Sequence, residues 1–177
     1  MQDLVFNIQP TNLKDLPSIY NFFDQAIDYQ KRNNYPVWPD YDKGLLIRDI
    51  EENKQFKLVV DDQMACVFTI CYEDKIVWRE KDTGDSLYLH RVAVNPIFKG
   101  NRLFGHINNW CAKRAEKNNL LYVRMDTWAD NPSLVNYYME FGYEIVEYFM
   151  TPDSDELPIQ QRGNNVVLLQ LEVLACQ

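Results

Sequence analysis

Two neighbouring stretches of the sequence carry most of the information about the fold. They are LYLHRVAVNPIFKGNRLFGHINNW at residues 87–110 and DTWADNPSLVNYYMEFGY at residues 126–143. The first opens with an apolar run typical of a strand, and a short loop, IFKGN, leads into a helix predicted over residues 103–118. In the second, Asn131 followed by proline starts a helix, and Gly142 ends it. Strands that alternate with helices in this way predict an α/β protein.

The rest of the chain adds strands and helices around this centre. Apolar alternation and helical spacing predict strands at residues 4–9, 56–61, 64–72, 87–94, 122–127, 143–150 and 166–173, and earlier helices at residues 16–31 and 46–53. Asp15 is the predicted N-cap of the first helix. Residues 73–85 are charged and predict a surface loop that continues the hairpin. With no linker, the order predicts one domain over residues 1–177, a mixed sheet with helices on both faces.

Composition excludes several classes of protein. The chain has 177 residues, 46% hydrophobic residues and a net charge of −8, which is typical of a globular protein and disfavours a nucleic-acid partner. It has neither an apolar run long enough for a membrane span nor a signal-peptide pattern at residues 1–10. The four cysteines and two histidines form no metal-ligand spacing. We therefore predict no metal, no membrane partner, and free thiols at Cys66, Cys71, Cys111 and Cys176 in a reducing cytoplasm.

The loop before the helix at residues 103–118 is a candidate phosphate site. The first N–H groups of a helix have no partner within the helix, and the helix dipole favours a negative charge there. Lys99 and Arg102 flank this turn and add positive charge to an acidic chain. The alternative is an ordinary turn with two solvated cations.

The helix that begins after Asn131 carries two candidate tyrosines. Tyr138 lies seven residues after Asn131, and a tyrosine hydroxyl beside a thiolate leaving group can donate a proton to it. Adjacent helical residues point about 100° apart, so one of Tyr137 and Tyr138 is expected to be a core or boundary aromatic. The alternative for either residue is a place in the core.

Together these residues resemble the GNAT superfamily of acetyl-CoA-dependent N-acetyltransferases. The family pattern has a V-x-P strand end, an R-G-x-G-x-G/A loop and the spacing N-x(6)-Y-x(3)-G-F, which here ends in Gly142-Tyr143. The element order extends the resemblance over residues 4–173. It implies a GNAT-like, mainly antiparallel central sheet with helices on both faces. It also implies transfer of an acetyl group from acetyl-CoA.

The resemblance assigns the residues around the cofactor. It implies that the backbone of one strand pairs with the pantetheine arm, that the loop amides hold the pyrophosphate, that one asparagine contacts the cofactor, and that Tyr138 is the general acid. The cofactor-binding residues would be Val92, Ala93, Val94, Lys99, Gly100, Asn101, Arg102, Leu103, Phe104, Gly105 and Asn131. Two residues depart from the pattern: Arg102 replaces a glycine, and Phe104 replaces a glycine or alanine. Arg102 can point away into a salt bridge, whereas Phe104 faces the core or narrows the groove.

The general base and the acceptor side are less defined by the motifs. His90 titrates near neutral pH and is the candidate base, with Glu73 or Asp74 as alternatives, whereas His106 is predicted on the surface. For the acceptor side we predict Trp38, Tyr35 and Glu73. The alternative for Trp38 and its aromatic neighbours is a loop packed on the core.

The expected reaction is direct attack of a primary amine on acetyl-CoA in a ternary complex. The acceptor is a small molecule, and the acidic chain favours a cationic one. Two alternatives remain open: a non-catalytic acyl-CoA binder or sensor, motivated by Arg102 and Phe104, and an interaction module whose groove is closed. The sequence is consistent with a monomer or a homodimer.

Overall fold

The computed structural model of the chain describes residues 5–173, so Leu4 and Cys176 lie outside the described part. The helices and strands are β1 (Phe6–Pro10), α1 (Leu16–Arg32), α2 (Lys43–Glu51), β2 (Gln55–Val60), β3 (Gln63–Cys71), α3 (Lys75–Trp78), β4 (Ser86–Val94), α4 (Phe104–Lys117), β5 (Tyr122–Trp128), α5 (Pro132–Met139), β6 (Glu144–Met150) and β7 (Asn165–Glu172). No helix within residues 5–173 is both long enough and apolar enough to cross a membrane.

One seven-stranded sheet organises these elements, in the order β1-β2-β3-β4-β5-β7-β6. Every neighbouring pair of described strands is antiparallel except β4 and β5, which run parallel. The predicted mixed, mainly antiparallel sheet is therefore confirmed, and each predicted strand lies within a few residues of its expected bounds.

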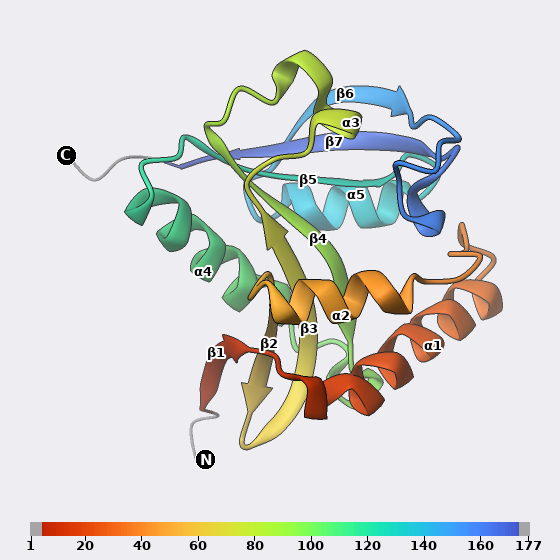
Figure 1. Cartoon of the computed structure of the whole chain (residues 1–177), viewed down its shortest axis with the longest axis vertical. Coiled ribbons are helices and arrows are strands. Elements are labelled where there is room, and N and C mark those ends of the chain that lie inside the picture. Colours follow the sequence, from red (N-terminus) through yellow and green to blue (C-terminus); the bar gives the residue numbers. More distant parts are fainter. Residues whose placement is uncertain (1–4, 174–177) are drawn as a thin grey trace.

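Helices cover both faces of the sheet, as expected (Figure 1). On one face, α1 and α2 bury residues such as Phe23 and Leu46 against β3 and β4. Further along this face, α3 packs Val77 and Trp78 against β4 and β7. On the other face, α4 and α5 form the largest core with β2 to β5 and β7. The sheet thus separates two apolar layers, and a cleft that reaches both layers must pass between two of its strands.

Strands β4 and β5 separate in the middle of this sheet. They pair only where Ser86–Tyr88 faces Tyr122–Arg124, although both strands continue beyond that point. A β-bulge adds to the divergence, because the β3–β4 register shifts between Val67 and Thr69 and Arg91 takes a left-handed φ of 51°. Figure 1 shows β4 turning away from β5. Beyond Tyr88, the edge of β4 that faces β5 is open to a ligand.

Residues 73–85 correct the prediction of a surface loop. This segment contains α3 and a 3₁₀ turn, Arg79–Lys81, and Trp78 is fully buried between β4 and β7. The apolar run at residues 76–78 is too short to stand out from its charged neighbours by periodicity. Burial of Trp78 fixes the whole segment on the sheet, and this matters for the site below.

The start of α1 differs in its capping chemistry. Asp15 occupies the N-cap position as predicted, but its side chain makes no cap hydrogen bond. Instead Asn12 caps the preceding 3₁₀ turn, and the Asp15 carboxylate accepts from the Asn12 N–H and pairs with Lys57 at 2.8 Å. The capping box therefore starts one turn earlier than the sequence pattern indicated.

Candidate active site

The separation of β4 and β5 opens a cleft that crosses the sheet. It encloses about 610 Å³ and is lined by both strands, by α1, by the loop before α4, and by α5. Leu89 and Tyr138 reach it from the α4–α5 face, whereas His90 and Asp126 reach it from the α1–α3 face. Most of its surface is apolar, with a few convergent polar groups, which is the usual character of a small-molecule site.

The loop from Lys99 to Gly105 presents free backbone donors at one end of this cleft. Within residues 5–173, the N–H groups of Gly100, Arg102, Leu103 and Phe104 donate to no protein acceptor. Gly100 has a φ of 87° and Arg102 a φ of 50°. Arg102 thus keeps the left-handed backbone that glycine adopts easily, so its side chain changes the chemistry without removing the turn. This donor set suits a phosphate group.

The side chains of this loop are already engaged. Arg102 Nη1 pairs with Glu140 Oε2 at 3.0 Å and its guanidinium lies over the Phe141 ring, so it points into a salt bridge. The Lys99 ammonium lies 3.8 Å from the centre of the Tyr29 ring. Both residues still line the cleft. Within residues 5–173, no carboxylate lies at salt-bridge distance from the Lys99 ammonium, whereas Glu140 neutralises Arg102.

Phe104 and Gly105 set how α4 packs. Phe104 is buried against Tyr138 and Phe141, with ring centres 4.8 and 5.1 Å away, and it also lines the cleft. It therefore packs in the core and also forms part of the cleft wall. A Cβ on Gly105 would lie 3.2 Å from the Phe141 ring, so glycine allows the helix to approach α5.

Helix α5 places Tyr138 at the cleft. The buried Asn131 side chain accepts the Leu134 N–H and so caps the helix, which fixes where Tyr138 falls. Burial raises the pKa of Tyr138, with smaller contributions from Tyr137, Cys66 and Asp126, so the hydroxyl holds its proton at neutral pH. Tyr137 is half-buried and also lines the cleft. Asn131 is outside the cleft lining, and the capping bond occupies its side-chain oxygen.

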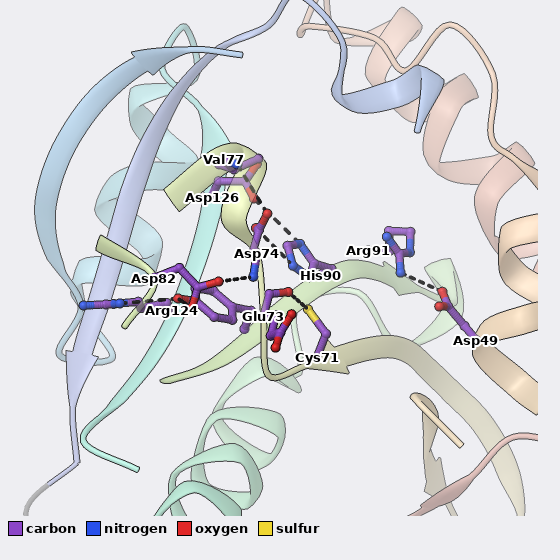
Figure 2. Close-up of polar contacts among 11 residues, drawn as sticks. Asp49, Cys71, Glu73, Asp74, Val77, Asp82, His90, Arg91, Arg124 and Asp126 are labelled. Carbon is purple, nitrogen blue, oxygen red and sulfur yellow. Dashed lines mark hydrogen bonds and ion pairs between the residues drawn. The ribbon is translucent and has the colours of Figure 1, made fainter. Parts of the chain in front are cut away.

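His90 lies between two carboxylates where β4 and β5 begin to separate. Its Nε2 is 3.4 Å from Asp74 Oδ2, and its Nδ1 is 3.7 Å from Asp126 Oδ1 (Figure 2). His90 and Asp126 each lie two residues beyond the last β4–β5 pair, Tyr88 and Arg124, so strand alternation puts them on the same face. Asp74 comes from the N-cap of α3, where its backbone N–H donates to Asp82. Only the tertiary fold brings these three side chains together.

Burial controls the charge of this cluster. It raises the pKa of Asp74 to about 7 and that of Asp126 to about 6, and it lowers that of His90 to about 3. The imidazole is therefore neutral at pH 7, and the Asp74 carboxyl is close to half-protonated. The ligand atoms of the three residues lie within 4.8 Å of one another, as a bound cation would require. Because each imidazole nitrogen faces a carboxylate oxygen, proton exchange between these groups is the better fit.

No local sequence signal marks Asp126 as a site residue. Asp126 follows core residue Met125 on a strand, so a polar residue there fits the usual alternation of apolar and polar side chains. It belongs to no recognisable motif. Its role depends on the parallel pairing of β4 with β5, which sets it opposite His90. Asp74 appeared only as an alternative base, because the segment that fixes it was predicted to be a surface loop.

A buried ion pair supports the β4 bulge. Arg91 Nη2 lies 2.6 Å from Asp49 Oδ2 on α2, and the two side chains are 10% and 6% exposed. Burial raises the pKa of Asp49 in spite of this pair. Figure 2 shows the pair beside the His90 cluster. Arg91 carries the strained backbone of the bulge, so the pair fixes the strand at the point where the cleft opens.

The predicted acceptor residues divide between three places. Trp38 lines the cleft, packed on Phe23 and Trp128. Glu73 is exposed and lines a second cavity of about 350 Å³. Tyr35 lines neither cavity and its ring centre lies 6.0 Å from that of Tyr29. His106 is exposed, as predicted, and stacks on Phe6 at 3.8 Å.

Comparison with known proteins agrees with this fold, although no family model matches the chain. The chain is 26% identical over 145 residues to YesJ of Bacillus subtilis, an uncharacterized N-acetyltransferase, and the match covers 77% of this chain and 81% of that one. The crystal structure of a GNAT-family acetyltransferase from Listeria monocytogenes superposes with a TM-score of 0.75 at 18% identity, over 94% of both chains. One from Streptococcus agalactiae gives 0.72 at 15%, over 97% of this chain and 96% of that one.

These findings confirm the resemblance seen in the sequence. The protein has the GNAT fold, and its sequence is similar to that of an N-acetyltransferase.

Proposed function

We propose that the protein transfers an acetyl group from acetyl-CoA to the primary amine of a small acceptor, by direct attack in a ternary complex. The observation that carries this proposal is the cleft between β4 and β5, which is lined both by a loop with free phosphate-type donors and by the titratable side chains of His90 and Asp126. Acetyl-CoA would supply a thioester-activated acetyl group. The single-domain organisation of residues 1–177 stays a prediction.

Cofactor binding is proposed along β4 and the loop that follows it. The open edge of β4 at Val92, Ala93 and Val94 offers backbone groups to the amides of a pantetheine arm, as an added strand would pair. The free N–H groups at Gly100 and Arg102–Phe104 suit the pyrophosphate, with Lys99 as the nearby cation. Asn131 would act mainly through the position of α5, because its side chain caps that helix.

Tyr138 and His90 are the proposed acid and base. Tyr138 keeps its proton at neutral pH, as an acid for a departing thiolate must. His90 is neutral there, so one ring nitrogen is free to accept the proton of the amine. The two residues line the same cleft from opposite faces of the sheet.

The acceptor side is proposed to include Trp38 as a wall and Glu73 at the second cavity. Tyr35 would act only through the packing of its loop, because it lines neither cavity. A cationic acceptor is consistent with Asp126 in the lining of the cleft and with the net charge of −8. Free thiols at Cys66, Cys71 and Cys111 fit a reducing cytoplasm, which is the proposed location. The protein is proposed to be a monomer or a homodimer.

The test combines binding with turnover. Isothermal titration of acetyl-CoA measures the cofactor site, and thiol release over a panel of primary amines measures transfer. Binding together with amine-dependent release supports the proposal. Saturable binding without release from any amine favours the acyl-CoA sensor, which the Arg102–Glu140 pair makes the second candidate. An absence of binding contradicts both functions and leaves the interaction module.

A further inference from the structure

The two nitrogens of His90 face different compartments. Nδ1 faces Asp126 across the main cleft, whereas Nε2 faces Asp74, which lines the second cavity. His90, Arg91 and Gln161 line both cavities, so the two meet at the imidazole. A proton that enters His90 on one side and leaves on the other would therefore pass from one compartment to the other.

Asp74 is held in place by its surroundings. Its Oδ1 accepts the Val77 N–H at the start of α3, and its backbone N–H donates to Asp82 at 2.8 Å. Buried Trp78 anchors α3 to the sheet. The second oxygen, Oδ2, is buried and has no hydrogen-bond partner within residues 5–173, yet it is the atom nearest His90 Nε2. This oxygen is positioned to accept a proton from the imidazole.

On the side of the main cleft, two acceptors face each other without a donor. If His90 donates from Nε2 toward Asp74, the lone pair of Nδ1 points at Asp126 Oδ1, 3.7 Å away. A neutral imidazole has one donor and one acceptor nitrogen, and a carboxylate only accepts. The N–H groups of an amine between these two atoms would satisfy both.

We propose that Asp74 is the exit of a proton relay, which takes the proton of the acceptor amine from the main cleft through His90 to the second cavity. This inference rests on the proposed function. The lone pair of the amine forms the new C–N bond, the C–S bond breaks, and its electron pair stays on sulfur. The amine nitrogen gives a proton to Nδ1, and Nε2–H passes to Asp74 Oδ2. Asp74 then releases a proton to water in the second cavity. The imidazole regains its starting form by giving the Nδ1 proton to water in the main cleft and taking one at Nε2 from water in the second cavity. Tyr138 protonates the sulfur and regains a proton from water.

Several charged groups surround the relay and set its pH range. Facing Asp74 are Asp82 after α3, Arg91 and His90 on β4, Asp126 on β5, Cys71 on β3, and Glu156 across the second cavity. Burial and Asp126 raise the pKa of Asp74 to about 7, and Arg91 opposes them. The relay accepts a proton only when Asp74 is ionised, so the rate should rise with pH through about 7.

The test replaces Asp74 by asparagine, which keeps the helix cap and removes the proton acceptor. In Asp74→Asn we expect kcat with acetyl-CoA and a reactive amine to fall at least tenfold, with little change in the KM for acetyl-CoA. The rise of kcat near pH 7 should disappear. The matched control is Asp42→Asn, which removes a carboxylate that caps α2 in the same way and that lines neither cavity.

A second measurement does not depend on turnover. The chain has only two histidines, so ring ¹⁵N spectra assign His90 against His106. In wild type we expect a neutral His90 with its proton on Nε2 and a shift of its signals as Asp74 ionises near pH 7. Asp74→Asn should abolish that shift, and Asp74→Glu should retain it.

The outcomes separate the two proposals. A wild type that transfers acetyl to no amine contradicts the proposed function, and the spectra still decide the relay. Unchanged kcat and pH profile in Asp74→Asn overturn the relay, as does a His90 whose proton lies on Nδ1. If the asparagine variant fails to fold, the wild-type spectra decide: no change near pH 7 overturns the proposal.

Discussion

At the scale of single residues, the site depends on backbone conformations that few side chains tolerate. Gly100 lies at a φ of 87° and Arg102 at 50°, and these two conformations shape the loop that lines the cleft. Tyr138 depends on a cap seven residues earlier. Local geometry therefore decides which polar groups are free, and conservative substitutions can test each group.

Replacing Tyr138 by phenylalanine removes only the hydroxyl and keeps the buried ring. We expect kcat to fall at least tenfold, because general acid help is commonly worth about 10²–10⁴-fold. Acetyl-CoA affinity and melting temperature should change little. Steady-state kinetics with Tyr137→Phe as the matched control checks this. Equal effects of the two substitutions would remove the acid role from Tyr138.

Gly100 can be tested with a graded pair of substitutions. Proline cannot adopt a φ of 87°, so Gly100→Pro should weaken acetyl-CoA binding at least tenfold, about 1.4 kcal/mol. Gly100→Ala should have a smaller effect, because nothing lies within 4 Å of a Cβ there. Gly84→Ala is the control, since Gly84 also has a positive φ and open space but lies outside the cleft lining. Titration calorimetry that gives equal affinities for Gly100→Pro and wild type would contradict the phosphate loop.

At the scale of elements, contacts between segments hold the cleft open. The Asp49–Arg91 pair joins α2 to the β4 bulge, and the Trp78 anchor joins α3 to β4 and β7. Neither contact follows from the pattern of its own segment. Each brings a helix to the place where β4 leaves β5.

Asp49→Asn tests the contact between α2 and β4. It leaves the Arg91 charge buried without its partner, which typically costs about 3–5 kcal/mol. We expect a loss of this order in urea unfolding, together with weaker acetyl-CoA binding, because the bulge is no longer held. Asp155→Asn is the control: Asp155 pairs with Arg162 but its side chain is 98% exposed, so the loss should be under about 1 kcal/mol. Equal losses in the two variants would show that the buried pair does not support the cleft.

At the scale of the whole molecule, an acidic protein must attract an anionic cofactor. The net charge is −8, so the local cations at the loop oppose the field of the rest of the chain. Lys99 lines the cleft without a salt-bridge partner in the described structure, whereas Glu140 neutralises Arg102. Salt dependence of binding therefore reports how this local charge is used.

The double variant Lys99→Ala, Arg102→Ala should bind acetyl-CoA more weakly and with a flatter salt dependence. Each exposed contact is worth about 0.5–1 kcal/mol and is screened by salt. Glu140→Gln should do the opposite, because it releases Arg102 from its salt bridge. Titrations from low to high ionic strength check both. An unchanged salt slope in the double variant would make the two cations solvated surface groups.

The sequence by itself determined the elements, their order and the family resemblance, because strand and helix periodicity, Asn131 and the glycines at 100 and 142 are local signals. It also placed Tyr138 and the open strand Val92–Val94 on the correct elements. Only the tertiary structure decided that Asp126 and Asp74 meet His90, since parallel pairing of β4 with β5 and burial of Trp78 bring together residues 36 and 16 positions from it. Burial then set their protonation, because desolvation depends on every neighbour and no short motif encodes it.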